Sequence, residues 1–391
     1  MSLIMIADDF PPAVGGIQTY ACELALATAE LGEEVAVVAS AQPGAEAVDA
    51  ELPFTVVRVP TAGSYPAAAM NLSAGVQMAL RELSAPPRCI VATKWSPEGP
   101  AAILAVRALP RPIVLIGHGG EFAMSGGNLV KWLVQRSVLR RTARCLANSA
   151  YTADLFARAR IPRERIGIIY GGVRPERFER DPAEAAGLRA ELGVGAAPML
   201  LTVARLVERK GHETVLRALP AVLAQVPGAR YVIVGDGPTH APLEALVAEL
   251  ELGDAVIFAG RADDDRLPVY YAASDLFVMP GHPVRGELAE GLGLAFLEAA
   301  AAGVPSVGTS FGGIPDAIAD GETGLLVAPR DHDALADALA RLLLEADLRA
   351  HMGAAARERV LREFTWRRVA ERFLAELAMV APTAPGEGAP A

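Results

Sequence analysis

The feature that most constrains the fold is a regular alternation between short apolar runs and longer segments with helical periodicity. Apolar runs without a polar face predict buried strands, and in the first half they fall at 3–7, 35–39, 54–59, 89–93, 113–116 and 145–147. Helical patterns separate them at 16–31, 66–83, 97–109, 129–141 and 151–159. This alternation predicts a parallel, doubly wound α/β sheet, whose ligands bind outside the carboxyl ends of the strands.

The alternation starts again after an acidic, Gly- and Ala-rich connector at 181–198. Strands are expected at 199–204, 231–234, 256–259, 276–279, 304–308 and 324–327, and helices at 331–345 and 348–364. A chain of 391 residues is long for one hydrophobic core, so two domains are expected. We place them at 1–180 and 196–364, followed by an amphipathic helix at 365–379 and a disordered tail at 380–391.

Composition excludes several classes of function. The net charge of −10 gives no basic field for nucleic acid, and three separated cysteines in apolar runs indicate buried thiols rather than disulfides or a zinc site. The first residues lack the basic region of a signal peptide, and no apolar run reaches the roughly 20 residues of a membrane span. We expect a cytoplasmic protein.

The segment EGLGLAFLE at 290–298 is the strongest candidate for a ligand site. Gly291 and Gly293 allow a close approach of backbone to ligand, and the helix expected from Leu294 offers free N–H groups to an anion. If the segment were helical throughout, Glu290 and Glu298 would lie about 12 Å apart and could bind groups on either side of a diphosphate. The alternative is an Ala-rich core helix whose two glutamates are surface residues.

Two cations favour the ligand interpretation. Arg205 and Lys210 follow the first strand of the second sheet, where they can neutralise a diphosphate. A charged surface turn would have a similar sequence. Gly235, in the GDGP turn, follows the next strand, while Asp263–Asp265 are expected to cap a helix, so we predict no metal site.

The first sheet has two weaker candidates. Gly15 and Gly16 open the first helix and can present N–H groups to an anion, although an ordinary tight turn has the same pattern. His118 follows the fifth strand among glycines, at the edge where such sheets place functional residues, although a lone histidine is often structural.

Trp132, Arg136, Arg140 and Arg144 recur every four residues and would form a basic stripe on one helix. In an acidic protein this stripe could contact anionic lipid headgroups or a phosphorylated acceptor. The alternative, which the sequence favours, is a solvated helix face.

Together these motifs resemble the retaining glycosyltransferases of family 4, which have the two-domain GT-B fold. The resemblance is carried by GGI at 15–17, ARLVERKG at 204–211, VGDGP at 234–238, FAGR at 258–261, the 290–298 segment and AAGVPSVGTSFGGIPD at 301–316. It implies two Rossmann-like domains facing each other across a cleft, with the final helix crossing back to the N-terminal domain.

The resemblance also implies roles for individual residues. Arg205 and Lys210 would bind the diphosphate of a nucleotide-sugar donor, Glu298 the ribose and Glu290 the transferred sugar. His118 would lie near the sugar and the acceptor. The other residues implied at the donor are Gly15, Gly16, Gly235, Arg261, Gly291, Leu292, Gly293 and Leu294.

Within the family, DFPPAVGGIQTY and GLGLAFLE look most like bacterial GDP-mannose-dependent mannosyltransferases that act on phosphatidylinositol mannosides. That subgroup typically has a second histidine two residues after the first, where this chain has Gly120. The acceptor, a lipid or a glycan, is therefore left open, as is the location at the inner face of the membrane.

The implied activity is hexosyl transfer with retention of anomeric configuration and without a metal or other cofactor. A UDP-sugar-dependent transferase of the same family is the nearest alternative. A nucleotide-sugar epimerase or hydrolase on the same fold is a third, and a non-catalytic sensor of sugar nucleotides a fourth.

Overall fold

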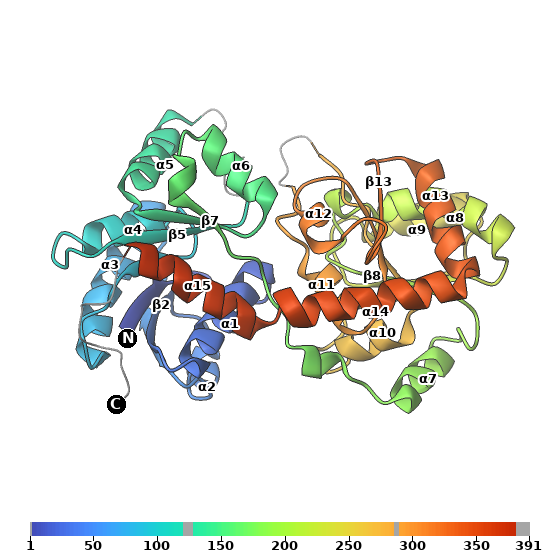
Figure 1. Cartoon of the computed structure of the whole chain (residues 1–391), viewed down its shortest axis with the longest axis horizontal. Helices are drawn as coiled ribbons and strands as arrows, with labels where there is room; N and C mark the ends of the chain where they lie inside the picture. The colour runs from blue at the N-terminus through green and yellow to red at the C-terminus, as the bar shows by residue number, and fades with distance from the viewer. Residues whose placement is uncertain (1, 120–127, 285–288, 381–391) are drawn as a thin grey trace. The chain divides into compact units, whose positions relative to one another are not determined.

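The computed structural model of the protein describes residues 2–119, 128–284 and 289–380 (Figure 1). The chain forms two compact units, one made of Met1–Gly172 and Trp366–Ala391 and the other of Val173–Thr365. We call them unit 1 and unit 2 and describe each by itself. The predicted tail at 380–391 falls, apart from Val380, outside the described residues.

Unit 1 is built on a seven-stranded sheet with the order β3-β2-β1-β4-β5-β6-β7, in which every neighbouring pair is parallel. Its strands are β1 (Ser2–Ile6), β2 (Glu34–Ser40), β3 (Thr55–Val59), β4 (Ile90–Ala92), β5 (Ile113–Gly117), β6 (Arg144–Ala147) and β7 (Ile166–Ile168). Its helices are α1 (Gly16–Glu30), α2 (Ala45–Asp49), α3 (Tyr65–Glu82), α4 (Glu98–Ala105), α5 (Leu129–Arg141), α6 (Ala150–Arg158), the short η2 (Arg163–Arg165) and α15 (Trp366–Val380).

Helices cover both faces of this sheet because successive side chains of a strand point to opposite faces. Ile4 and Ile6 pack into one core with residues of α3 and α4, whereas Leu3 and Met5 pack into another with residues of α1 and α15. Figure 1 shows α15 beside α1 in this unit. The final helix thus packs on the N-terminal domain, as predicted.

Unit 2 contains a six-stranded parallel sheet with the order β10-β9-β8-β11-β12-β13. Its strands are β8 (Met199–Val203), β9 (Arg230–Val234), β10 (Val256–Gly260), β11 (Leu276–Val278), β12 (Ser306–Thr309) and β13 (Gly324–Val327). Its helices are η3 (Pro175–Phe178), α7 (Pro182–Glu191), η4 (Glu208–Lys210), α8 (His212–Gln225), α9 (His240–Glu249), α10 (Leu267–Ala273), α11 (Leu294–Ala301), α12 (Ile314–Ala317), α13 (His332–Leu344) and α14 (Ala346–Glu363).

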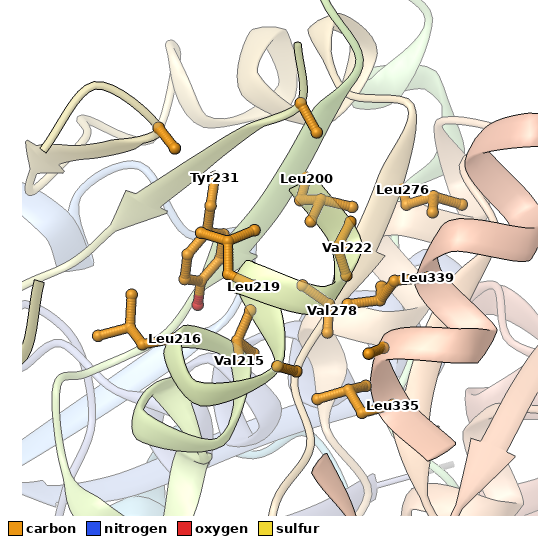
Figure 2. Packing of buried hydrophobic residues seen from close by; sticks show 14 of the residues in the cluster. Leu200, Val215, Leu216, Leu219, Val222, Tyr231, Leu276, Val278, Leu335 and Leu339 are labelled. Atoms are coloured by element: carbon orange, nitrogen blue, oxygen red, sulfur yellow. The ribbon is translucent and has the colours of Figure 1, made fainter. Parts of the chain in front are cut away.

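The largest core of unit 2 lies between its sheet and helices α8 and α13. Figure 2 shows Leu216 and Leu219 of α8 gathered with Tyr231 of β9, and Leu335 and Leu339 of α13 near Val278 of β11. This core gives the strands a rigid base from which the loops at their carboxyl ends extend.

The boundary between the units lies earlier than predicted. Residues 173–195, which the sequence pattern divides between the first domain and a connector, belong to unit 2. Arg189 of α7 donates to Ala273 O (2.5 Å) and pairs with Asp275 (3.4 Å), and Arg177 donates to Asp264 O (3.2 Å). These contacts join α7 and η3 to α10, so the segment is a packed part of unit 2 despite its connector-like composition.

Each sheet has one point where the order of strands reverses. In unit 1 it lies between β1 and β4, and in unit 2 between β8 and β11. Loops leaving the carboxyl ends of two such strands diverge to opposite faces and leave room for a ligand. None of the helices in the described part of the chain is both long and apolar enough to span a bilayer.

Candidate functional site

The loops that follow β8 and β11 meet at the reversal point of unit 2. His282 N donates to Arg209 O (3.1 Å), and a Cβ at Gly211 would collide with Pro280 O. Gly211 also has a φ of 78°, so it supplies both the turn and the close approach. The segment with Arg205 and Lys210 therefore lies against the segment that leads to Glu290.

Lys210 and Glu290 form an ion pair in this site. Lys210 Nζ donates to Glu290 Oε2 (2.5 Å), and Arg209 Nη1 donates to the same oxygen (3.2 Å). Burial alone would raise the pKa of Glu290, but the two cations outweigh it and hold that pKa below its usual range. The structure thus joins two residues for which the sequence predicted separate roles, and it adds Arg209, which sequence reasoning missed although it stands beside Lys210 in the same turn.

The turn at 205–210, which we call the cationic turn, has more basic than acidic side chains. Arg205, Arg209 and Lys210 lie within six consecutive residues that also include Glu208, whose carboxylate pairs with Arg330 (3.4 Å). Arg205 is exposed, and Lys210 is largely buried with its side chain 14% exposed. Partly buried cations of this kind can stabilise an anionic group in place of water.

The backbone around Glu290 is fixed by the FGGIP turn that follows β12. Gly313 N donates to Glu290 O (2.9 Å), and a Cβ at Gly313 would collide with Gly291 O. Only glycine allows these two turns to pack so closely. The 311–315 turn therefore packs directly against the backbone of Glu290 and Gly291.

Glu298 has different surroundings from Glu290. The helix α11 begins at Leu294 after Gly293, whose φ is 86°, so Glu298 is helical and Glu290 is not. The expected separation of about 12 Å between Glu290 and Glu298 required one continuous helix over 290–298. Gly293 interrupts that helix, so the expectation does not apply. Tyr271 of α10 donates its hydroxyl to Glu298 (2.6 Å), and burial raises the pKa of Glu298 although this hydrogen bond opposes the rise.

The turns after β9 and β10 complete the edge of unit 2. Gly235 N donates to Gly260 O (2.7 Å), and Leu206 N donates to Asp236 O (3.0 Å). These bonds bring the Gly235 turn against the Arg205 turn and the residue before Arg261, and Arg205 and Arg261 are exposed. Leu292, by contrast, is buried.

The predicted cap by Asp263–Asp265 is not formed. Helix α10 begins at Leu267, Arg266 occupies the cap position, and no side chain caps it. The carbonyl of Asp263, rather than its carboxylate, accepts from the N–H groups of Arg266 and Leu267 (both 3.0 Å). This backbone turn already satisfies the two N–H donors at the start of α10, so they need no carboxylate as a cap.

In unit 1, His118 follows β5 at the carboxyl edge of the sheet, as predicted. Its Nε2 lies 3.0 Å from Thr93 O, so this nitrogen carries the proton, and Tyr20 meets its ring edge-on with centroids 5.0 Å apart. Burial lowers the pKa of His118 to about 4, against the opposing hydrogen bond to Thr93, so the ring is neutral at pH 7. Gly15 caps α1, and the space next to Gly16 is open.

A second Lys–Glu pair, which sequence reasoning missed, lies at the same edge. Lys94 follows β4 and interacts with Asp9 and Glu98. The four-residue spacing of Lys94 and Glu98 was visible in the sequence, but Pro97 between them gave no reason to expect an ion pair.

The predicted basic stripe is only partly correct. Trp132, Arg136 and Arg140 are exposed on α5, and the guanidinium of Arg136 lies 5.3 Å from the Trp132 ring centroid. Arg144 is buried, because α5 ends at Arg141 and the chain enters β6 before the next four-residue step. There Arg144 pairs with Glu376 of α15 (2.5 Å) and donates to Glu164 O. Its role is thus to attach the final helix.

Exposed apolar residues accompany the remaining stripe. Leu129, Val130, Leu133 and Val134 lie in the first turns of α5 with exposed fractions between 37% and 69%. We call Leu129, Val130, Lys131, Trp132, Leu133, Arg136 and Arg140 the α5 surface. It combines apolar and cationic side chains, which is typical of surfaces that bind membranes.

Two doubly wound units, with a cationic turn at the reversal point of the second, fit a glycosyltransferase of the GT-B class, and comparison with known proteins agrees. The sequence profile described as "Glycosyl transferases group 1" matches residues 188–359, and that described as "Glycosyltransferase Family 4" matches residues 14–177. The chain belongs to glycosyltransferase family 4 and is a hexosyltransferase.

Relatives with assigned activities are similar over nearly the whole chain. One is a GDP-mannose-dependent alpha-(1-6)-phosphatidylinositol monomannoside mannosyltransferase of Mycobacterium tuberculosis, 36% identical over 95% of this chain and 96% of that protein. A protein of the same description from Mycolicibacterium smegmatis is 34% identical over 96% and 97% of the two chains.

Solved structures support the GT-B fold. Anabaena Alr3699/HepE in complex with UDP and glucose has a TM-score of 0.79 at 21% identity, covering 97% of this chain and 100% of that one. Sucrose-phosphate synthase from Thermosynechococcus elongatus has a TM-score of 0.77 at 23% identity, covering 96% and 97%.

Proposed function

We propose that this chain transfers mannose from GDP-mannose to a phosphatidylinositol monomannoside-type glycolipid, with retention of anomeric configuration and without a metal ion. The observation that carries the proposal is the cluster at the reversal point of unit 2, in which Lys210 and Arg209 both form ion pairs with Glu290. The activities assigned to relatives at 34% and 36% identity support the choice of donor and acceptor.

In this proposal the cationic turn binds the donor diphosphate. Arg205, Arg209 and Lys210 stabilise the negative charge that develops on the departing phosphate, and they do so without reorganisation of water. Since these protein cations can serve the charge-neutralising role of a divalent ion, we expect transfer to persist in the presence of EDTA.

Glu290 then binds hydroxyl groups of the transferred sugar. Its lowered pKa keeps it an ionised hydrogen-bond acceptor at neutral pH, and its contact with Lys210 aligns the sugar with the diphosphate. Glu298, oriented by Tyr271, binds the ribose. Arg261 borders the base.

No protein nucleophile is needed in this reaction. The acceptor hydroxyl attacks the anomeric carbon on the face that the diphosphate leaves, and a phosphate oxygen takes its proton. The C–O bond to phosphate breaks as the new glycosidic bond forms, so the configuration is retained. His118, which the resemblance implies near the sugar and the acceptor, is neutral at pH 7 and adds no charge there.

The proposed acceptor is a lipid, and the α5 surface is the proposed contact with its membrane. Trp132 and Leu133 would enter the interface, while Lys131, Arg136 and Arg140 would meet anionic headgroups. Replacing Trp132 and Arg136 together should reduce co-sedimentation with phosphatidylinositol-containing vesicles about tenfold, given roughly 1 kcal/mol for each basic residue near such a surface. Arg163→Met, at an exposed arginine outside α5, is the matched control and should bind like the wild type.

A thermal-shift panel of GDP-mannose, UDP-glucose and ADP-glucose tests the donor, because a ligand that binds only the native state raises its melting temperature. GDP-mannose should give the largest shift. Transfer to phosphatidylinositol monomannoside, followed by NMR assignment of the new anomeric centre as α, tests the reaction. A larger shift with UDP-glucose, or a β product, would contradict the proposal.

A further inference from the structure

The reversal point of unit 1 carries an ionic cluster that the proposed donor chemistry does not use. Asp8 and Asp9 follow β1, and Lys94 follows β4, so they leave the two strands between which the order reverses. In a doubly wound sheet this is the place where a ligand binds.

The contacts of the cluster run from the inside outward. Glu98 Oε1 accepts from Asp8 N (3.2 Å) and lies 3.4 Å from Lys94 Nζ. Lys94 Nζ donates in turn to Asp9 Oδ2 (2.5 Å). Ser40 donates its hydroxyl to Asp8 (2.5 Å), which fixes the start of the loop.

Exposure of the side chains follows the same order. Glu98 is 0% exposed, Lys94 15% and Asp9 45%. Glu98 therefore lies behind Lys94, and the Asp9–Lys94 pair forms the accessible end. Within the described residues, Glu98 Oε2 is buried without a hydrogen-bond partner.

Stability does not account for this arrangement. A buried ion pair is on average no more stabilising than apolar residues of the same volume, because both charges must leave water. A buried carboxylate with an unused oxygen is a further cost. Such a group is retained where it orients another residue for function.

The cluster is next to His118. His118 Nε2 is hydrogen-bonded to the carbonyl of Thr93, the residue before Lys94, and the charge of Lys94 contributes to the lowered pKa of His118. Lys94, Asp9 and His118 thus belong to one edge of unit 1.

We propose that Lys94 and Asp9 bind hydroxyl groups of a neutral polyol ring of the acceptor, and that Glu98 is the positioning residue of Lys94. This inference rests on the proposed function, since it names the part of the transferase's acceptor that unit 1 recognises.

The charge of the cluster favours a neutral ring over a phosphate. The ammonium group of Lys94 contacts the carboxyl groups of Asp9 and Glu98, and the charge of Asp8 also acts on it, so an anionic ligand would be repelled. A hydroxyl group, in contrast, can donate to Asp9 and accept from Lys94 at the same time. Vicinal hydroxyls on a sugar or cyclitol ring match such a pair, and the phosphate of the lipid would then bind elsewhere.

Steady-state kinetics test the roles of the residues. Lys94→Met and Asp9→Asn should each raise the acceptor KM about tenfold to a hundredfold, as expected for a lost hydrogen bond to a charged group, and leave the donor KM unchanged. Lys94→Arg should recover part of the loss, and Glu98→Gln should give a smaller rise. Asp154→Asn, at an exposed ion pair of unit 1, is the matched control.

Folding can be separated from recognition. Lys94→Met leaves Glu98 buried without its cation, so the double variant Lys94→Met/Glu98→Gln removes both charges and should melt within a few degrees of the wild type. If it folds and its acceptor KM is that of the wild type, the proposal is wrong. A change confined to the donor KM would also overturn it.

Direct binding decides the proposal even if the proposed donor is incorrect. Ligand-observed NMR with methyl α-mannoside and myo-inositol, in the presence of GDP, should detect binding to the wild type that is lost in the double variant. Mannose 6-phosphate should bind at least tenfold more weakly than methyl α-mannoside. Tighter binding of the phosphate, or no binding of either neutral ring, would refute the assignment, whereas absence of transfer from GDP-mannose would refute only the proposed function.

Discussion

The two units place the same pair of residue types at their reversal points, yet the glutamates differ in pKa. In unit 2, Glu290 contacts Lys210 at 2.5 Å and Arg209 at 3.2 Å, and its pKa is lowered. In unit 1, Lys94 at 3.4 Å is the one cation that forms an ion pair with Glu98 among the residues that the structure describes, and burial raises the pKa of Glu98 to about 7 although Lys94 opposes the rise. The number and distance of the cations thus decide the charge of a buried carboxyl group.

Burial and ion pairing also oppose each other in their effects on the pKa of Lys94. Burial by itself disfavours the ammonium group of Lys94, but Glu98 and Asp9 outweigh it, and the pKa of Lys94 rises. The pKa values of both partners rise together because the attraction keeps Lys94 charged while the deeper burial of Glu98 still resists its ionisation. At the reversal point of unit 2, Arg205, Arg209 and Lys210 outnumber Glu208 and Glu290, as the proposed binding of a diphosphate requires. At that of unit 1, Asp8, Asp9 and Glu98 outnumber Lys94, as the proposed binding of hydroxyl groups requires.

The largest effect is expected from Lys210→Met. Loss of a cation that stabilises the leaving group should lower kcat by about 100- to 1,000-fold, as is typical for one such contact. The matched change in unit 1, Lys94→Met, should act mainly on the acceptor KM. If both variants instead lowered kcat alone and to the same degree, the two pairs would not have separate roles.

Glu290→Gln should separate binding of the nucleotide from transfer of the sugar. Without its negative charge, Lys210 and Arg209 are free for phosphate, so affinity for GDP should rise severalfold in calorimetry. Transfer should fall by roughly 10- to 100-fold because an ionised partner of the sugar hydroxyls is lost. Weaker binding of GDP would show that Glu290 orients the cations rather than competing with the phosphate.

The pH dependence of stability should differ in sign between the two glutamates. The pKa of Glu98 is raised from 4.5 to about 7, so the folded state holds its proton more tightly and stability is lost as pH rises through this window. At about 1.4 kcal/mol per pKa unit, the loss is on the order of 3 kcal/mol. Glu290 has a lowered pKa, so its contribution is present above its unfolded pKa and is lost as pH falls through the folded value.

Urea unfolding of wild type and Glu98→Gln at pH 5 and pH 8 measures this. The variant should be more stable than the wild type by a small margin at pH 5 and by a larger margin at pH 8. His118, whose lowered pKa destabilises the fold as pH falls from 6.5 to about 4, is common to both proteins and cancels in the difference. Equal pH slopes for the two proteins would mean that Glu98 is ionised throughout.

The smallest effect tests the second cation directly. Arg209→Met leaves Glu290 with one lysine, as Glu98 has, and the pKa of Glu290 should therefore rise. We expect kcat/KM to fall about tenfold, the value of one hydrogen bond to a charged group, and the acidic limb of its pH profile to move to higher pH. An unchanged acidic limb would show that Lys210 alone sets the charge of Glu290.

Most of the fold could be predicted from the sequence because buried parallel strands are continuous apolar runs that helical periodicity does not imitate. The runs at 35–39 and 231–234, for example, correspond to β2 and β9. The boundary between the units could not be predicted, since the composition of α7 does not reveal that Arg189 bonds to the end of α10. The prediction that Arg144 continues the basic stripe was wrong, because a four-residue spacing does not indicate where a helix ends, and α5 ends at Arg141.

The sequence by itself determined the family, the two doubly wound sheets and the candidate residues around Arg205, Lys210, Glu290 and Glu298, because turn glycines and strand ends occupy fixed places along the chain. Only the tertiary structure decided which of these residues form ion pairs with one another. Glu290 and Lys210 are 80 positions apart, and Asp9 and Lys94 are 85 apart. Such pairs form where the loops of neighbouring strands meet, and their pKa values follow from burial and from the distances between side chains, which no local pattern encodes.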